Sequence, residues 1–311
     1  QETDELFEQL LLLKKNDHTI IFISHKIREV MQICDNITVL RAGRTVGSIP
    51  VANATEEDIS RFMVGRYVIL KMNKKQAEFG DTLLKVTDLT YENKEGRKLL
   101  DHVSFSLKKG QILGIAGVEG NGQNELAEAI FGFYSGVKGS ILFDGKEILG
   151  KSIRAIRDDG ISYIPEDRIK TGAAGNISLW GNMIADIIDS PLLKKHGLLN
   201  YKNIHERADK LISDFGVLCQ NDDQPIGMLS GGNMQKVVVA REFSSDPKLL
   251  IANQPTRGID VGANEFIWKK IIEQRDAGKG VILISADLNE IMELSDSILV
   301  MCGGQAAAYF E

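Results

Sequence analysis

Apolar residues with helical or alternating spacing divide the chain into predicted helices and strands. Residues 1–16 have helical spacing and place Leu6, Leu10 and Leu13 on one face. Residues 19–24 (TIIFIS) predict a strand, which a predicted helix (HKIREVMQIC) and a second strand (NITVL) follow. Because the chain begins without a methionine, we expect a fragment of a longer protein.

The later segments alternate strands with helices. Residues 83–91 (LLKVTDLTY) and the VSFSL run alternate apolar with polar positions, which is typical of antiparallel strands. Residues 249–253 (LLIAN) and the VILIS run are continuously apolar, as in strands buried on both faces. Residues 171–243 are rich in helical patterns, of which NIHERADKLISDF is the clearest. These segments predict an α/β fold with a mostly parallel sheet, an antiparallel β subdomain and a helical insert.

An internal repeat organises the chain. The segment TIIFISHKIREVMQICDNITVLRAGR, starting at Thr19, matches GVILISADLNEIMELSDSILVMCGGQ, starting at Gly280, at an offset of 261 (280 − 19). Similarity at so long a period indicates duplicated units. We therefore predict a C-terminal remnant of a first domain at 1–66, a linker at 67–82 and most of a second domain at 83–311, truncated at its C-terminal end. Within the repeat, His25 of the first copy is replaced by Ala286, which suggests that the two copies differ in function.

Composition and charge narrow the class of protein. The net charge is −6 and the Lys and Arg residues are dispersed, which argues against binding to a nucleic-acid backbone. Cys34, Cys219 and Cys302 lie far apart in the sequence, so we expect buried thiols in a reducing compartment and no cysteine metal site. No signal peptide and no apolar run of about 18 residues is present. We expect a cytosolic protein that only a partner holds at a membrane.

Residues 110–132 (GQILGIAGVEGNGQNELAEAIFG) predict a strand, a glycine-rich loop and a helix that opens near Gln123. Glycines allow positive φ angles, so consecutive N–H groups of such a loop can point at an anion. The positive end of the helix dipole adds to the site. The glycines of this candidate phosphate loop are Gly117, Gly120 and Gly122. Glycine-rich loops also close turns without any ligand, so the loop alone does not decide between the two readings.

A more specific motif, LSGGNMQ, occupies residues 229–235 and precedes a predicted helix. A serine followed by two glycines at a helix start offers a hydroxyl and N–H groups to an anion. The alternative is an ordinary helix N-cap, in which Ser230 only satisfies backbone donors.

Taken together, these motifs resemble those of the ATP-binding-cassette (ABC) ATPases, which are P-loop NTPases. LSGGNMQ is similar to the family signature, GVEGNGQN to its phosphate loop, and KLLIANQPTRGID to its magnesium-binding strand and the loop that ends in Asp260. ISYIPED takes the place of the glutamine loop, with Glu166 near the glutamine position, and FISHK resembles the histidine switch. The motifs follow the family's order across residues 83–311.

The resemblance implies a role for each matching residue. It implies that Tyr91 stacks on adenine, as an aromatic residue usually does at that position of the family. It implies further ATP contacts for Gly117, Gly120, Gly122, Gln123, Asn124 and Glu166. It implies signature contacts for Ser230, Gly231, Gly232 and Gln235, a switch role for His25 and a catalytic position at Gln254. It places the Mg²⁺ positions at Asn124 and Asn253.

Within the family, LSGGN, YIPEDR and PTRGIDVGA resemble the two-cassette subunits of simple-sugar and nucleoside importers, with GVEGNGQNE closer to the nucleoside branch. This resemblance implies ATP and Mg²⁺ as cofactors and integral-membrane permease subunits as partners. It also implies an indirect partnership with an extracytoplasmic solute-binding protein and a peripheral place on the cytoplasmic face of the plasma membrane.

The second cassette departs from the family pattern at five positions. These are Gln123 for the loop lysine, Asn124 for the hydroxyl, Asn253 for the metal-binding aspartate, Gln254 for the catalytic glutamate and Ala286 for the switch histidine. A positioned general base contributes about 10²–10⁴-fold in rate, and a charge-assisted hydrogen bond about 1.5–3 kcal/mol. We therefore expect a degenerate site that holds a nucleotide weakly and does not hydrolyse it.

In this family two cassettes close head to tail, so the signature motif here would complete the nucleotide site of the first cassette, together with His25. Two alternatives remain. The chain could be a regulatory or structural nucleotide-binding module, or a cassette ATPase acting on DNA or ribosomes. The lack of zinc-spaced cysteines and of a basic arm disfavours the last.

Overall fold

The computed structural model describes residues 2–24, 26–41, 43–65, 72, 74–195, 198–259 and 261–311. The chain forms two compact units, residues 1–70 with 260–265 and residues 71–259 with 266–311. Each unit has its own core, and each is described by itself. In the part of the chain that the structure describes, none of the helices combines the length and the apolar character of a membrane-spanning segment.

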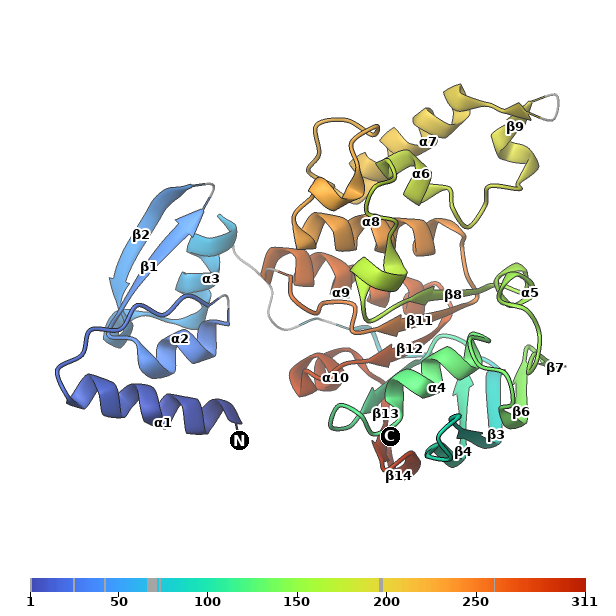
Figure 1. Ribbon diagram of the computed structural model, residues 1–311, viewed down its shortest axis with the longest axis horizontal. Helices are drawn as coiled ribbons and strands as arrows, with labels where there is room; N and C mark the ends of the chain where they lie inside the picture. Colours follow the sequence, from blue (N-terminus) through green and yellow to red (C-terminus); the bar gives the residue numbers. More distant parts are fainter. Residues whose placement is uncertain are drawn as a thin grey trace. The chain divides into compact units, whose positions relative to one another are not determined.

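Unit 1 is built on a two-stranded antiparallel sheet (Figure 1). Its elements are α1 (Glu2–Lys15), α2 (Ile27–Ile33), β1 (Asn36–Arg41), β2 (Arg44–Pro50), η1 (Val51–Asn53) and α3 (Glu56–Val64). Ile37, Val39 and Ile59 form its small buried core. The Thr55 hydroxyl accepts a hydrogen bond from the Asp58 N–H, and this capping box fixes the start of α3.

Two sequence predictions fail in unit 1. Residues 19–24 form no strand, and Ile21 and Ile23 are 88% and 92% exposed, because no strand of the described part of unit 1 pairs with them. The helix at 1–16 is confirmed as α1, but Leu6 and Leu13 are exposed. Phe7 is buried instead, because its ring contacts Phe22 edge to face at 6.3 Å.

Unit 2 contains the predicted mostly parallel sheet, in the strand order β14-β13-β5-β12-β11-β8. The strands are β5 (Ile112–Ala116), β8 (Ile161–Ile164), β11 (Leu249–Asn253), β12 (Gly280–Ile284), β13 (Ser297–Cys302) and β14 (Gln305–Phe310). All neighbours pair in parallel except β13 and β14. The continuously apolar strands β11 and β12 are buried along their whole length, as predicted.

A four-stranded antiparallel sheet, in the order β4-β3-β6-β7, forms the predicted β subdomain. Its strands are β3 (Thr82–Glu92), β4 (Lys98–Lys108), β6 (Lys138–Phe143) and β7 (Lys146–Glu147). The helices beside the two sheets are α4 (Gln123–Ile130), α5 (Ile153–Asp158), α9 (Val261–Asp276) and α10 (Leu288–Leu294). The main core of unit 2 joins apolar side chains of both sheets and α4.

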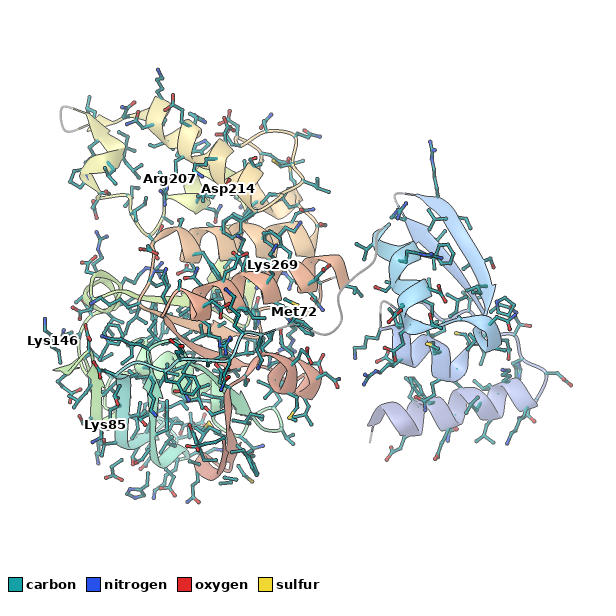
Figure 2. All side chains as sticks on the ribbon, turned by 180° about the vertical axis from the view of Figure 1, so that it is seen from behind. Met72, Lys85, Lys146, Arg207, Asp214 and Lys269 are labelled. Carbon is teal, nitrogen blue, oxygen red and sulfur yellow. The ribbon has the colours of Figure 1, made fainter. Side chains whose placement is uncertain are left out.

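The helical insert lies on the other side of the parallel sheet from the antiparallel sheet (Figure 1). It comprises η2 (Arg168–Gly172), α6 (Leu179–Met183), η3 (Pro191–Leu193), β9 (Lys194–Lys195), β10 (Leu198–Leu199), α7 (Tyr201–Asp214), η4 (Ile226–Met228) and α8 (Gly231–Ser244). Figure 2 labels Arg207 and Asp214 on the insert and Lys85 and Lys146 on the antiparallel sheet, at opposite ends of unit 2.

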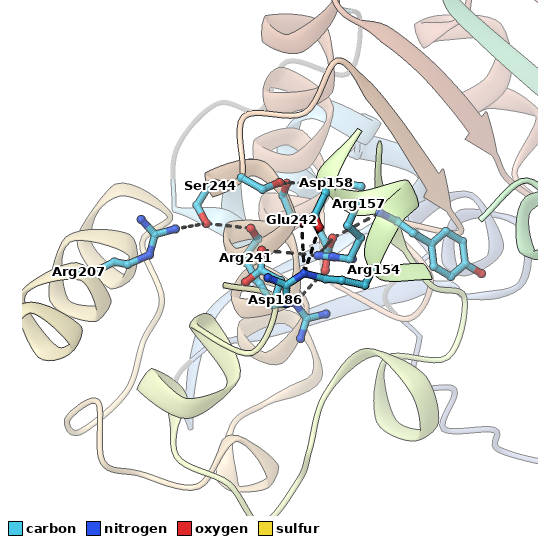
Figure 3. A network of polar contacts seen from close by, with 11 residues as sticks. Arg154, Arg157, Asp158, Asp186, Arg207, Arg241, Glu242 and Ser244 are labelled. Carbon is cyan, nitrogen blue, oxygen red and sulfur yellow. Dashed lines mark hydrogen bonds and ion pairs between the residues drawn. The ribbon is translucent and has the colours of Figure 1, made fainter. Parts of the chain in front are cut away.

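A buried polar network attaches α8 to the parallel sheet (Figure 3). The Glu242 carboxylate is 1% exposed, and its Oε2 pairs with Arg157 Nη2 at 2.8 Å and accepts the Tyr163 N–H at 3.3 Å. Its Oε1 accepts from Arg241 Nε at 2.8 Å. Burial and the nearby Glu242 charge raise the pKa of Asp186, which lies 3.5 Å from Arg157. The network therefore fixes the helix that follows the LSGGN motif.

The sequence repeat is also a repeat of structure. Helix α2 and strands β1 and β2 recur, 261 residues later, as α10, β13 and β14. The strand pairing recurs as well, since Ile37↔Ile49 corresponds to Ile298↔Phe310. Even the irregularity after Val39 recurs after Val300. The two copies therefore share one local fold.

Residues 67–71 and 73 of the predicted linker lie outside the described residues. Its described end is hydrogen-bonded to unit 2. Met72 N–H donates to Glu293 at 2.5 Å, Lys74 Nζ donates to the Ser295 carbonyl at 2.6 Å, and Arg275 donates to the Lys75 carbonyl at 2.9 Å.

The prediction of buried thiols is wrong for Cys302, which is exposed, while Cys34 and Cys219 are partly exposed. Cys302 is the last residue of β13 and precedes Gly303, and both residues are exposed where the chain turns into β14.

Candidate functional site

The carboxyl ends of β5, β11 and β12 lie at one edge of the parallel sheet, beside a cavity of about 210 Å³. Its lining residues are Gly117, Glu119, Gly120, Gln123, Asn124, Glu125, Glu166, Gln254, Ile284, Ser285 and Ala286. The structure thus brings most of the predicted nucleotide-contacting positions together around one cavity, here called the glycine-loop pocket. Its volume is below the ~300–1,000 Å³ of typical ligand pockets.

The lysine position of the loop is filled by a side chain that turns back on the loop itself. Gln123 is 7% exposed, and its Nε2 donates to the Val118 carbonyl at 3.1 Å. A Cβ at Gly117 would collide with the Gln123 amide. Gly122 caps α4 with φ 101°, which favours glycine. The glycines thus shape the loop as a cradle. The Gln123 amide, however, bonds to the loop backbone, whereas the lysine expected at this position would contact phosphate.

The two predicted metal positions are hydrogen-bonded to each other. Asn253 is 1% exposed, and its Nδ2 donates to Asn124 Oδ1 at 2.7 Å. Asn124 Nδ2 in turn donates to the Glu166 carboxylate. Mg²⁺ requires near-octahedral oxygen ligands, usually including carboxylates. This donor set does not fit Mg²⁺, because the Asn124 amide oxygen is already bonded to Asn253 and its nitrogen to Glu166.

The position of the catalytic glutamate also carries a side chain with an internal partner. Gln254 has φ 51°, an uncommon conformation for a residue other than glycine. Its Oε1 accepts the N–H of Ala286 at 3.1 Å. A neutral amide at this place cannot take a proton from water.

Acidic groups dominate the electrostatics of the glycine-loop pocket. Glu119, Glu125 and Glu166 line it, and no Lys or Arg is among its described lining residues. Arg257 lies beside it and pairs with Glu166, and its Nη1 lies 3.6 Å from Glu119. Arg257 stands inside the PTRGID motif, but no sequence pattern singled it out as a site residue. The pocket therefore does not fit a polyphosphate anion on its own, because the carboxylates that line it would repel the phosphate charge.

The predicted adenine-stacking residue is not among the lining residues of the cavity. Tyr91 stacks on Tyr134 with ring centroids 4.4 Å apart and an interplanar angle of 17°. Burial and a hydrogen bond to Glu128 raise the pKa of Tyr134. One face of the Tyr91 ring is therefore covered by protein.

Behind the pocket, Glu290 of α10 links two other elements. Its side chain is 1% exposed and accepts hydrogen bonds from Thr256 Oγ1 at 2.8 Å and Trp268 Nε1 at 2.6 Å. Burial raises the pKa of the Glu290 carboxyl above its usual 4.5. Sequence analysis recognised Glu290 only as a repeat position.

The predicted signature residues lie at the N-terminus of α8. Ser230 is its N-cap, and the hydroxyl accepts a hydrogen bond from the Asn233 N–H at 3.4 Å. Ser230 therefore does cap the helix, as the alternative interpretation predicts. The N–H groups of Gly231 and Gly232 have no partner within the helix, since the first four never do. Gln235 is buried and donates to the Pro255 carbonyl at 2.8 Å. Gln235 therefore positions the loop after β11.

Two predicted residues, His25 and Asp260, lie outside the described residues. Apart from Tyr91, the remaining predicted positions lie at two places in unit 2, the glycine-loop pocket with its supporting residues and the N-terminal turn of α8. In the pocket most polar side chains bond to protein groups, although Asn253 Oδ1 is buried without a partner, whereas the helix start presents N–H donors.

Known proteins match both the sequence and the fold. The sequence model of a family described as "ABC transporter" matches residues 100–257. The glucose import ATP-binding protein TsgD13 of Haloferax volcanii is 40% identical over 98% of this chain and 56% of its own length. The guanosine import ATP-binding protein NupO of Bacillus subtilis is 40% identical over 99% of this chain and 60% of its own length. The nucleoside import ATP-binding protein NupA of Lactococcus lactis is 36% identical over 98% of this chain and 60% of its own length.

The chain thus spans about three fifths of the length of these relatives. Among solved structures, a nucleotide-free ATP-binding cassette from an ABC transporter covers 74% of this chain and is itself covered to 91%, with a TM-score of 0.63 and 26% identity. A cassette dimer bound to ADP and phosphate has the same TM-score at 20% identity, covering 74% of this chain and 98% of its own. These likenesses confirm the predicted cassette fold.

Proposed function

Because this chain belongs to the ABC transporter family, we propose that it is part of the ATP-binding subunit of an importer. The subunit couples ATP binding and hydrolysis to the uptake of a nucleoside or a simple sugar. The names of its relatives support this solute class, since they include glucose, guanosine and nucleoside import.

The proposed subunit contains two cassettes. Residues 1–66 contribute the end of the first, 67–82 a linker, and 83–311 the second, whose helical subdomain spans about 171–243. Support comes from the recurrence of α2, β1 and β2 as α10, β13 and β14 with the same strand register. The greater length of the relatives leaves room for the rest of the first cassette.

The two nucleotide sites of this subunit are unequal. The single observation that carries this proposal is the bond between Asn253 and Asn124, which occupies the metal positions of the glycine-loop pocket with two amides. Gln254 at the base position supports the same conclusion. Hydrolysis then takes place at the first cassette's site, which Ser230, Gly231 and Gly232 complete from this domain, with His25 as its switch residue and Mg²⁺ bound there.

The partners follow from the importer role. Integral-membrane permease subunits bind the cassettes at the cytoplasmic face of the plasma membrane, and an extracytoplasmic solute-binding protein delivers the solute to them. The solute is selected by those partners. Uptake assays with the solute-binding protein encoded beside this subunit would identify it.

A second candidate applies to the 311 residues taken alone. They act as a nucleotide-binding module without turnover. The turned-back amide of Gln123 favours this reading, because it leaves the loop without a cation for phosphate.

An ATPase assay with Mg·ATP tests both statements. We expect no turnover from residues 1–311 alone and Mg²⁺-dependent turnover from the longer protein that carries both cassettes. In nucleotide titrations of the short chain, removing Mg²⁺ with a chelator should leave the weak affinity unchanged. Mg²⁺-dependent hydrolysis by the short chain would overturn the proposed inequality of the sites.

A further inference from the structure

Arg168, in the YIPEDR segment, has a role that the cassette motifs do not assign to it. It is the first residue of η2, a short π-helix that the Asp167 carboxylate caps by accepting the N–H groups of Ile169 and Lys170 at 2.9 and 3.0 Å. The same carboxylate lies 3.8 Å from Lys170 Nζ. Asp167 thus fixes the turn from which the Arg168 side chain extends.

The Arg168 guanidinium reaches two other motifs. Nη1 donates to the Arg257 carbonyl at 2.6 Å, and Nη2 donates to the Gly258 carbonyl at 3.4 Å. A Cβ at Gly231 would lie 2.7 Å from Nη2, and one at Gly258 would lie 3.5 Å from it. The first glycine of the signature and the glycine of PTRGID therefore leave room for the same guanidinium. They place it directly against the N-terminus of α8.

The neighbouring Asp167 carboxylate interacts with the Arg168 charge, but its hydrogen bonds go to the N–H groups of Ile169 and Lys170. Among the described residues, no carboxylate forms an ion pair with Arg168, and its Nε is buried without a hydrogen-bond partner. The adjacent N-terminus of a 14-residue helix carries a partial positive charge of its own. Two positive groups side by side are electrostatically unfavourable unless an anion binds between them.

We propose that Arg168 is a phosphate-binding residue of the composite nucleotide site, acting beside Ser230, Gly231 and Gly232 on the nucleotide held by the other cassette. The inference rests on the proposed head-to-tail pairing of cassettes. Two carbonyls hold the guanidinium fork, which leaves further N–H donors for phosphate oxygens, a geometry that arginine provides and lysine does not.

The glycine-loop pocket is not the target of Arg168. That pocket already has a guanidinium beside it, from Arg257, which is paired with Glu166 and lies 3.6 Å from Glu119. Arg168 donates to the backbone carbonyls of Arg257 and Gly258, which are neutral groups, so its own charge remains available for an anion from outside this domain.

The test uses the full-length two-cassette subunit assembled with its permease, and the variants Arg168→Gln, Arg168→Lys and Arg97→Gln. Arg97 is an exposed arginine and serves as the matched control. Loss of a charge-assisted contact should raise the KM for ATP roughly ten- to a hundredfold in Arg168→Gln. Arg168→Lys should show a smaller rise of at least about threefold, since it keeps charge without the fork. Arg97→Gln should match the wild type.

A purely structural brace would give a different pattern, with a lower melting temperature and a lower kcat at unchanged KM. That pattern, or a KM within about twofold of the wild type in Arg168→Gln, would overturn the proposal. If Arg168→Gln does not fold, the KM of Arg168→Lys decides by the same criterion.

A Ser230→Ala subunit assayed in parallel separates a failure of this inference from a failure of the proposed composite site. An inactive Ser230 variant beside an unaffected Arg168 variant refutes only this inference, whereas full activity in both refutes the composite site itself.

Discussion

The glycine-loop pocket and the N-terminus of α8 differ in where their polar groups find partners. In the pocket, Asn253 bonds to Asn124, Asn124 to Glu166, and Glu166 to Arg257, while Gln254 bonds to the backbone of Ala286. At the helix, the first N–H groups have no intrahelical partner and Arg168 has no carboxylate partner among the described residues.

This contrast concerns how the polar groups of the two surfaces are paired. In the pocket, the side chains of Asn124, Glu166 and Gln254 bond to protein groups, and Asn253 donates to Asn124 although its own Oδ1 is buried without a partner. Buried polar groups without partners are costly, so such pairing stabilises the pocket without a ligand. We propose that this distribution of partners distinguishes a half-site that has lost hydrolysis from one that still meets an anion.

The largest expected effect comes from the ion pairs that hold each surface in place, namely those of Glu242 in α8 and of Glu166 in the pocket. Glu242→Ala would leave Arg157 and Arg241 without their buried carboxylate, and breaking a buried pair costs about 3–5 kcal/mol. Glu166→Ala, in the pocket, breaks a pair whose arginine is 52% exposed, and such pairs contribute about 0–1 kcal/mol. Urea unfolding of both variants measures the difference. Asp158→Ala, beside the same network but exposed, is the control (Figure 3). Equal losses of stability would contradict the contrast.

A smaller effect concerns Glu290, behind the pocket. Burial raises the pKa of its carboxyl above 4.5, so the folded state holds the proton more tightly than the unfolded state does. Its contribution to the unfolding free energy is fully present below the unfolded pKa and is lost as the pH rises through the folded pKa. As the pH rises above the unfolded pKa, Glu290→Gln should therefore lose less stability than the wild type, since its amide does not titrate.

The same substitution at the repeat-equivalent position, Glu29→Gln, is the matched control for that measurement. Glu29 accepts from Ser24 Oγ at 3.0 Å and pairs with Lys26 at 3.0 Å. The free energy of unfolding of Glu29→Gln should retain the wild-type dependence on pH. If Glu290→Gln also retains it, the carboxyl is not protonated in the folded protein.

Local patterns predicted what depends on local sequence. The periodicity located β11, β12 and α7, and the sequence repeat at an offset of 261 coincides with a repeat of structure in the hairpins β1–β2 and β13–β14. Residues 19–24 have the same strand pattern but form no strand, because a strand needs hydrogen-bonding neighbours as well as its own sequence. The fold class could therefore be predicted, but not which segments find a partner.

The candidate site was predictable only in part. Motif glycines and the amides at 123, 124, 253 and 254 are visible in the sequence. The contacts of Arg257 with Glu166 and of Arg168 with Arg257 join residues 91 and 89 positions apart, through loops whose conformation no local pattern specifies. Tyr91 was expected against adenine, but its contact with Tyr134 depends on the tertiary packing of β3 beside the segment after α4.

The most direct measurement of the proposed asymmetry compares Ser230→Ala with Gln123→Ala in the full two-cassette subunit. Ser230→Ala should lower the ATPase rate roughly a hundredfold, the effect of removing a donor from a charged transition state. The loss of the N-cap costs only about 1 kcal/mol of stability, which a melting curve would verify. Gln123→Ala should keep the rate within about twofold, because its amide contacts only the Val118 carbonyl. Equal losses of activity in the two variants would contradict the account.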